Sequence, residues 1–412
     1  MINYHKRTLD NGLTVIVEQD TSTTLTAVNV LYKVGSRNES PSKTGVAHLF
    51  EHLMFEGSRH APDFDTPLQM AGGENNAFTN NDYTNFYDVV PAANIETALW
   101  LEADRMSALN LNTEALELQK KVVIEEFKEV CLNKPYGDNW HHLSALAYKR
   151  HPYRWPTIGF DIDHVASVTL ADVHDFYSRY YQPSNAILSL SGPLDEELVF
   201  DLANKWFGDL SSQPRQESII EIEEDQMEKR YQKVISDVPL PIFLVACHMP
   251  GRRDDDYYAC DLLSDILSNG KSSRLYDRLV HQEKAFTSVD CYLSGSMDPG
   301  LILIEGKPLN ISVETGVEMV WNEVLKIQSH PPTKRELQKV KNKVLSSIAM
   351  HDLSILNKAA SLAYFEFVGM LDKINQQEEL YNRVTIEDVI RVCENYMLED
   401  KSSLLEYQPN AD

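Results

Sequence analysis

The chain has 412 residues, of which 43% are hydrophobic, and its 62 acidic against 38 basic residues give a formal net charge of −24. This length predicts two or more domains, and the negative charge argues against nucleic acid and anionic membrane surfaces as partners. Five widely spaced cysteines indicate neither a disulfide framework nor a cysteine zinc site.

The first half of the sequence alternates between expected strands and helices. The pattern of β-branched and aromatic residues predicts strands at residues 8–17 around an Asn11-Gly12 turn, 25–34, 75–90 and 186–191. Apolar periodicity predicts helices at residues 45–56, 95–109, 113–132 and 170–180.

The second half partly repeats this order after an acidic segment. Residues 213–228 contain few large apolar side chains and are interpreted as a linker. A strand at 242–249, Gly251 and a helix at 257–267 follow, and a further helix is expected at 274–280. The sequence therefore predicts an α+β protein built by internal duplication, with domains at 1–212 and 229–412.

The helix expected at 45–56 carries a candidate metal site, His48-Leu-Phe-Glu51-His52. Residues i and i+4 of a helix share one face, with Cβ atoms roughly 5–6 Å apart, so the two imidazoles can bind one metal ion. Glu51 lies on the same face and can act as general base on a metal-bound water. The alternative is two partly buried histidines beside a surface glutamate, which is less favoured because buried polar groups are costly unless satisfied.

The ends of this helix and the third metal ligand are less certain from the residues alone. Ser42 or Thr44 is a candidate cap, and Gly57 is a candidate terminator. A catalytic zinc usually has three protein ligands and one open position. The candidates for the third ligand lie on the helix at 113–132, and spacing alone does not choose among Glu125, Glu126 and Glu129 or exclude a solvated acidic face.

Several further motifs carry a family resemblance. They are Val122-Val-Ile-Glu-Glu126, Gly72-Gly73, Asn76-Ala-Phe-Thr79, Asp82-x-Thr84, His151-Pro-Tyr, Trp155-Pro-Thr-Ile-Gly159, Tyr180-Tyr-Gln-Pro183-x-Asn185 and, in the second half, Ser272-Ser-Arg-Leu-Tyr276. Together with His48 to His52, they resemble the pitrilysin (insulinase-type) zinc metallopeptidases. The bacterial branch that is similar to the mitochondrial processing peptidase is the nearest match.

This resemblance implies a fold and a site. Each half is expected to be a mostly antiparallel sheet packed with helices, of the pitrilysin/LuxS-like metallohydrolase type, and two subunits or a fused pair would close around a chamber. The third ligand of one Zn²⁺ per chain falls on Glu126, supported by Gln119 where many members have Glu. The substrate peptide would add as a strand near Asn76, Ala77 and Phe78.

The chain departs from the family at two positions in its second half. Active members carry an Arg and a Tyr, seven residues apart, that hold the substrate and stabilise the intermediate. The corresponding positions here are Leu279 and Phe286, and only Arg278 lies nearby. The resemblance therefore implies a split site, in which a related second subunit supplies the Arg/Tyr pair.

The expected function is a zinc endopeptidase or oligopeptidase for short or unfolded peptides. His48, His52 and Glu126 would hold the zinc ion, and Glu51 would transfer the proton. The alternatives are a non-catalytic scaffold subunit, disfavoured by the retained site residues, and an active homodimer that uses Arg278 or another residue. Nucleotide binding at Asn269-Gly-Lys-Ser272 is excluded, because Asp265 stands where a P-loop needs Gly.

No membrane partner is expected, because the sequence contains no run of about 18 apolar residues. The start of the sequence also lacks the apolar stretch of a signal peptide. The cytoplasm is therefore the expected compartment, or the periplasm if a leader was removed.

Overall fold

The computed structural model describes residues 1–214 and 219–410, which form two compact units. Unit 1 comprises Met1–Phe127, Trp155–Ile220 and Ile348–Asn375, and unit 2 comprises Lys128–Arg154, Glu221–Ser347 and Gln376–Asp412. These units are discontinuous, whereas the sequence predicted uninterrupted domains at 1–212 and 229–412. The difference arises because two helices, one near residue 140 and one near residue 360, each pack on a sheet formed by distant parts of the chain.

Each unit contains one sheet. The strands are β1 (Tyr4–Thr8), β2 (Thr14–Gln19), β3 (Leu25–Tyr32), β4 (Glu74–Thr79), β5 (Thr84–Pro91), β6 (Ala186–Gly192), β7 (Arg230–Ser236), β8 (Ile242–Met249), β9 (Phe286–Ser294), β10 (Gly300–Pro308) and β11 (Ser403–Pro409). The six-stranded sheet of unit 1 has the order β1-β2-β6-β3-β5-β4, and the five-stranded sheet of unit 2 has the order β7-β11-β8-β10-β9.

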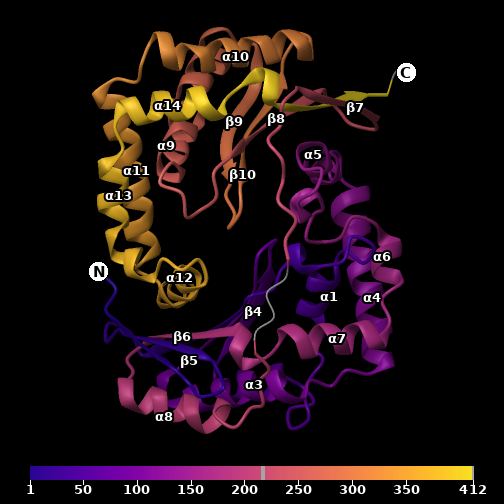
Figure 1. The fold of residues 1–412 in the computed structure, drawn as a ribbon, viewed down its shortest axis with the longest axis vertical. Coiled ribbons are helices and arrows are strands. Elements are labelled where there is room, and N and C mark those ends of the chain that lie inside the picture. The colour runs from indigo at the N-terminus through magenta and orange to yellow at the C-terminus, as the bar shows by residue number, and fades with distance from the viewer. Residues whose placement is uncertain (215–218, 411–412) are drawn as a thin grey trace. The chain divides into compact units, whose positions relative to one another are not determined.

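Helices cover both sheets (Figure 1). They are α1 (Val46–Leu53), α2 (Asp65–Met70), α3 (Ile95–Ala108), α4 (Thr113–Phe127), α5 (Asn139–Ala147), α6 (Ile162–Ala166), α7 (Leu170–Tyr180), α8 (Glu196–Phe207), α9 (Tyr257–Ser268), α10 (Val313–Ser329), α11 (Lys334–His351), α12 (Ile355–Phe367), α13 (Gln377–Arg383) and α14 (Ile386–Tyr396). None of these helices is long and apolar enough to cross a membrane, in the parts of the chain that the structure describes.

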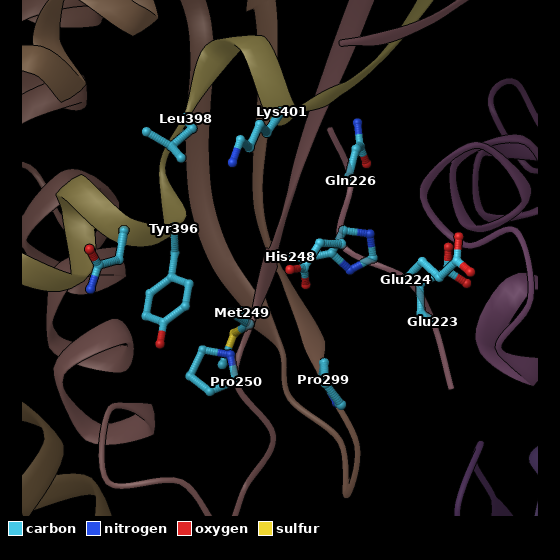
Figure 2. A pocket seen from close by; sticks show the side chains of 12 residues that line it. Glu223, Glu224, Gln226, His248, Met249, Pro250, Pro299, Tyr396, Leu398 and Lys401 are labelled. Atoms are coloured by element: carbon cyan, nitrogen blue, oxygen red, sulfur yellow. The ribbon is translucent and has the colours of Figure 1, made fainter. Parts of the chain in front are cut away.

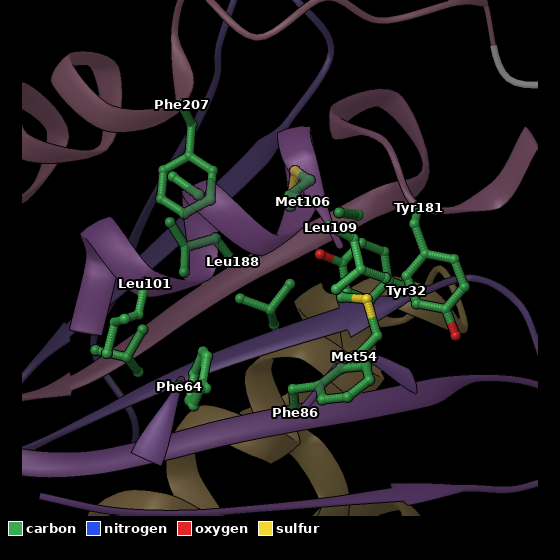
Figure 3. Packing of buried hydrophobic residues seen from close by; sticks show 14 of the residues in the cluster. Tyr32, Met54, Phe64, Phe86, Leu101, Met106, Leu109, Tyr181, Leu188 and Phe207 are labelled. Carbon is green, nitrogen blue, oxygen red and sulfur yellow. The ribbon is translucent and has the colours of Figure 1, made fainter. Parts of the chain in front are cut away.

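The main core of unit 1 lies on one face of its sheet. Alternate residues of the central strands, such as Val28, Val30 and Tyr32 of β3, point into this core because successive side chains of a strand face opposite sides. Helices α3 and α8 pack on this face (Figure 1). Figure 3 shows how Phe86 and Leu188 from the sheet meet aromatic and aliphatic side chains from the helices.

Helix α12 covers the opposite face of the same sheet, against β2, β3 and β6. Ser189 on β6 donates a hydrogen bond of 2.7 Å to the carbonyl oxygen of Ala359. The ammonium of Lys358, almost fully buried, lies 2.9 Å from Glu18 and 2.5 Å from Asp20 on the sheet side. Polar contacts as well as apolar packing therefore hold α12 to unit 1.

The two sheets share one plan. Without β1, the unit 1 order β2-β6-β3-β5-β4 matches the unit 2 order β7-β11-β8-β10-β9 in chain sequence. The first pair is parallel in both sheets and the other pairs are antiparallel. This agreement supports the predicted duplication and confirms the α+β fold with a mostly antiparallel sheet in each unit.

Several predicted elements differ in detail from the structure. The single strand expected at 75–90 is a hairpin, β4 and β5, because Asn80 Oδ1 accepts hydrogen bonds from the N–H groups of Asp82 and Tyr83 and closes a turn. The helix expected at 113–132 ends at Phe127 and continues as a π-helical turn, Lys128–Leu132. The helix expected at 274–280 is also a π-helical turn, Tyr276–Gln282.

Part of the predicted linker at 213–228 is anchored to unit 2, and its residues 215–218 lie outside the described chain. The Glu223 carboxylate accepts hydrogen bonds of 2.8–3.0 Å from the N–H groups of Lys149, Arg150 and His151. Gln226 is buried and donates to the carbonyl oxygen of Ser402. Glu223 and Gln226 border a cavity of about 360 Å³, shown in Figure 2, which is lined by none of the predicted site residues.

Candidate functional site

Helix α1 buries one apolar side and leaves its metal-capable side chains on the other. The buried residues are Val46, Ala47, Leu49, Phe50 and Leu53. His48, Glu51 and His52 are partly exposed, and the side-chain exposure is 13% for His48 and 23% for His52. The helix therefore presents the three polar groups of the motif together on an accessible face.

The start of α1 is capped by a residue that the sequence analysis did not identify. Neither predicted cap bonds to the helix: Thr44 Oγ1 instead contacts His164 Nδ1 and accepts from the N–H of Phe160. The Glu39 carboxylate accepts hydrogen bonds from the N–H groups of Gly45, at 3.0 Å, and Ala47, at 2.8 Å. A buried carboxylate thus satisfies N–H groups that an α-helix leaves without partners at its start.

The end of α1 also differs from the prediction. The helix ends at Leu53, and its cap is Met54 in right-handed helical conformation. Gly57, the predicted terminator, has a φ of 87° and lies in the turn after the helix. A Cβ at this position would approach the carbonyl oxygen of Pro62 to 2.2 Å, so the turn requires glycine for both conformation and space.

Helix α4 brings Glu126, rather than Glu125 or Glu129, to the two histidines. Glu126 Oε2 lies 3.7 Å from His48 Nε2 and 3.4 Å from His52 Nε2. Tetrahedral zinc with bonds of about 2.1 Å requires ligand atoms about 3.4 Å apart, which the two distances to Glu126 approach, and all three ligand atoms lie within 4.8 Å of one another. Among the described residues, these three form the one group of His, Cys, Asp or Glu found with metal-binding proximity.

Burial and charge set the protonation of this group. Burial lowers the pKa of His48 to about 4, which favours the neutral imidazole that binds metals. A hydrogen bond from His52 holds the pKa of Glu126 below its ordinary value. Burial alone would lower the pKa of His52, but the Glu126 carboxylate outweighs it and raises that pKa.

Gln119, the residue predicted to support the metal ligands, contacts one of the two imidazoles. Its Oε1 lies 3.2 Å from His52 Nδ1, and its Nε2 donates to the Glu56 carboxylate. Because Glu56 fixes the amide, Gln119 presents an acceptor to Nδ1–H and leaves His52 Nε2 directed at Glu126. His48 Nδ1 has no hydrogen-bond partner within the described chain, although it is buried.

Glu51 lies beside this group without belonging to it. Its Oε2 accepts a hydrogen bond of 2.6 Å from the hydroxyl of Thr79. Burial raises the pKa of Glu51, although the Thr79 hydroxyl opposes this shift. A partly buried carboxylate with a raised pKa takes up a proton more readily than an ordinary carboxylate, which suits proton transfer.

The predicted peptide-binding residues lie on the outermost strand of the first sheet. β4 pairs with β5 on one side only, and α1 packs against it. Asn76 and Phe78 are exposed, whereas Ala77 is partly buried. The N–H of Ala77 donates to the side-chain Oδ1 of Asn76 at 2.8 Å, so this amide covers part of the strand edge.

The second-half positions that correspond to the family's Arg and Tyr are buried and apolar. Leu279 is 1% exposed and Phe286 is 2% exposed, with the Phe286 ring against Phe243. Arg278 is exposed, but its guanidinium is paired with the Glu283 carboxylate at 2.6 Å. Leu279 and Phe286 therefore offer no side-chain donor to a substrate.

Sequence reasoning missed three residues that contact the site: Glu39, Glu56 and Thr79. A signal for Thr79 was available, because strand alternation places it on the same side of β4 as Ala77. Glu39 and Glu56 had no comparable signal. Both residues lie outside the predicted helices that they contact, and Glu56 meets a side chain 63 positions away.

Comparisons with known proteins place the whole chain among peptidases of one family. Residues 14–159 match the family described as Insulinase (Peptidase family M16), and residues 167–344 match Peptidase M16 inactive domain. Zinc protease PqqE of Helicobacter pylori is 30% identical, over 98% of this chain and 92% of that protein. The mitochondrial-processing peptidase subunit beta of Saccharomyces cerevisiae is 26% identical, over 95% of this chain and 88% of that protein.

The fold has a counterpart among solved structures. The crystal structure of a protease from Helicobacter pylori has a TM-score of 0.93 and 30% sequence identity, with 99% of this chain and all of that chain covered. The two structures agree over nearly the full length of both chains, so the similarity is not limited to the His48–His52 motif and helix α1. The chain belongs to the insulinase family of peptidases, family M16.

Proposed function

We propose that this chain is a zinc-dependent endopeptidase or oligopeptidase that hydrolyses short or unfolded peptides. The observation that carries this proposal is the convergence of His48 Nε2, His52 Nε2 and Glu126 Oε2 at distances that suit one zinc ion. Glu51 lies beside them and is held by a hydrogen bond of its own. The relatives that are named zinc proteases support the same class of reaction.

Each residue would have a distinct part in the reaction. His48, His52 and Glu126 would hold the ion, which when bound polarises a carbonyl and lowers the pKa of water. Glu51 would accept a proton from the attacking water on one carboxylate oxygen and deliver it to the leaving nitrogen. The exposed edge of β4 would bind the peptide backbone as an added strand, near Asn76, Ala77 and Phe78.

We propose further that the chain works as the metal-bearing subunit of a heterodimer. Leu279 and Phe286 are buried and lack polar side-chain atoms, and Arg278 is already paired with Glu283. A related subunit would therefore supply the Arg and Tyr that active members use. The yeast relative, whose name identifies it as a beta subunit, is consistent with this division.

The test is cleavage of a fluorogenic peptide library by the purified chain, with and without candidate M16 partners, together with its zinc content. We expect one zinc per chain, little cleavage by the chain alone, and cleavage by the mixture that Glu51→Gln abolishes. Glu51-dependent cleavage by the chain alone would overturn the heterodimer and favour a homodimer. Cleavage that Glu51→Gln leaves intact would overturn the peptidase site itself.

A further inference from the structure

The residue that holds Glu51 belongs to the strand that would bind the peptide. Thr79 is the last residue of β4, directly after Phe78, and its Oγ1 donates a 2.6 Å hydrogen bond to Glu51 Oε2. Residues 75, 77 and 79 of β4 are partly buried, whereas residues 74, 76 and 78 are exposed. This alternation places Thr79 on the partly buried side of the strand and fits its contact with Glu51 on α1.

The backbone of Thr79 is held firmly by the hairpin that follows it. Thr79 pairs with Thr84 of β5, whose hydroxyl donates to the carbonyl oxygen of Val34. The turn between them is closed by the Asn80 N–H and the Tyr83 carbonyl oxygen at 3.0 Å. The carbonyl oxygen of Asn80 also accepts from the N–H of Ser36. A β-branched side chain on such a backbone has few rotamers, so its hydroxyl has a defined direction.

Glu51, by contrast, is attached to its helix through a flexible side chain. Its neighbours in the site include His52 and the Glu126 carboxylate, which act on it electrostatically. Without a fixed donor, the Glu51 carboxylate can rotate among several positions near these groups, including positions where it would compete as a metal ligand. The Thr79 hydroxyl on Oε2, together with the Thr79 backbone N–H that also acts on this carboxylate, confines Glu51.

We propose that Thr79 is a positioning residue whose hydroxyl fixes Glu51 Oε2 for proton transfer. This inference rests on the proposed peptidase function. It links peptide binding along β4 to proton transfer by Glu51, because Thr79 belongs to that strand. A peptide bound along Asn76, Ala77 and Phe78 would end beside the residue that orients the base. The strand that receives the substrate would thus also set the direction of the proton-accepting group.

The kinetic test compares two substitutions at Thr79 in the active preparation, including the partner if one is required. Thr79→Val keeps the shape but removes the donor, so kcat is expected to fall about 10- to 100-fold, with KM and zinc content nearly unchanged. Thr79→Ser keeps the donor and should retain kcat within about threefold of the wild type. If Thr79 had only a structural role, Thr79→Val would not lower kcat alone while Thr79→Ser restored it.

Thr84→Val provides the matched control in the same hairpin. It removes the hydroxyl that bonds Val34 without touching Glu51. We expect this variant to lower the melting temperature while kcat at a permissive temperature stays near the wild-type value. An equal loss of kcat in Thr84→Val and Thr79→Val would show that loosening of the hairpin is responsible and would overturn the positioning role.

A second readout needs no activity and no metal. In the metal-free protein, Thr79→Val is expected to lower the melting temperature by about 1–3 °C when Glu51 is present. In a Glu51→Ala background, where the acceptor is gone, the same substitution should change the melting temperature much less. Equal shifts in both backgrounds would overturn the contact on which the inference depends.

The outcomes separate this inference from the proposed function. If Glu51→Gln leaves cleavage unchanged, the peptidase site is wrong, and the positioning role falls with it. If Glu51→Gln abolishes cleavage but Thr79→Val keeps the full kcat, the peptidase site stands and the positioning role alone is overturned.

Discussion

Units 1 and 2 use the same strand order but place different chemistry on the corresponding helix. Helix α1 follows β3 in the chain and packs against the edge strand β4. Helix α9 follows the corresponding strand of unit 2, β8, and packs against the edge strand β9. α1 carries His48, Glu51 and His52, whereas α9 presents Asp261, Ser264, Asp265 and Ser268 to a cavity of about 570 Å³. In the described chain, a metal-binding group was found only in unit 1.

This difference shows that the fold supplies a place for a site, while a few side chains supply the chemistry. A helix packed on an edge strand is present twice. Unit 1 adds two imidazoles four residues apart and a carboxylate from α4. In unit 2, burial raises the pKa of Asp261 and Asp265, so that their charged forms are disfavoured there.

The largest expected effect comes from removing an imidazole from unit 1. His52→Ala deletes one of three ligand atoms, so the zinc content should fall from one per chain to a small fraction in metal analysis after dialysis. His281→Ala removes an exposed histidine of unit 2 and should leave the zinc content unchanged. Full zinc occupancy in His52→Ala would contradict the site.

A second test compares two Gln–His pairs, one in each unit. Gln119→Ala removes the partner of His52 Nδ1, and zinc affinity should fall about 10- to 100-fold, measured by competition with a chelator. Gln232→Ala removes the contact of the Gln232 Nε2 amide nitrogen with His142 Nδ1 in unit 2 and should not change zinc affinity. Equal effects from the two variants would show that Gln119 does not act through the metal site.

A third test concerns the starts of α1 and α9. Glu39→Ala leaves the N–H groups of Gly45 and Ala47 without their acceptor, so the free energy of unfolding should fall by about 1–3 kcal/mol in a denaturant titration. Ser42→Ala, at a predicted cap that makes no such bond, should change it by less than about 0.5 kcal/mol. At the start of α9, the N–H of the cap residue Asp256 donates to the carboxylate of Asp254, only two residues earlier.

The smallest expected effect lies in unit 2 and depends on pH. Burial alone would raise the pKa of Glu223, but three backbone N–H donors outweigh it and hold that pKa below its ordinary value. The ionised Glu223 carboxylate therefore stabilises the fold at pH values above its ordinary pKa. This stabilisation is lost as the pH falls through the lowered pKa of the folded state. Glu223→Gln should cost less than about 1 kcal/mol at pH 7, because water screens part of the carboxylate.

Glu224→Gln is the control for this pH dependence. Glu224 is exposed and forms a surface pair with Arg150. We expect Glu224→Gln to change stability little at either pH, measured by thermal unfolding in parallel with Glu223→Gln. A Glu223→Gln deficit that persists unchanged at low pH would show that the carboxylate charge is not its cause.

The sequence pattern was sufficient to predict the bounds of helices and strands whose apolar periodicity lies within one continuous segment. Helix α7 and strand β8 have the predicted bounds to within a residue, because their apolar periodicity is uninterrupted. The grouping of His48, Glu51 and His52 on one helix face follows from helical spacing in the same way. Choosing Glu126 over Glu125 and Glu129 required either the family resemblance or the structure.

Contacts between distant segments could not be predicted in this way. Glu39 caps α1 from outside the helix, and Thr79 reaches Glu51 across 28 positions. The turn at Asn80 is formed by a side chain within a stretch of strand-forming residues. The Glu39 and Thr79 contacts are set by tertiary packing, which leaves no period in the sequence. The Asn80 turn is local and was missed because strand-forming residues flank it on both sides.

The docking of α12 has a consequence for how the chain is made. The sheet of unit 1 begins with β1, but the helix that covers one face of it is synthesised more than 300 residues later. Until then Glu18 and Asp20 lack the Lys358 ammonium, and the face of the sheet that α12 covers stays open. Unit 1 therefore cannot finish folding on the ribosome before most of unit 2 has emerged, and a fragment that stops at residue 212 would lack this face of its core.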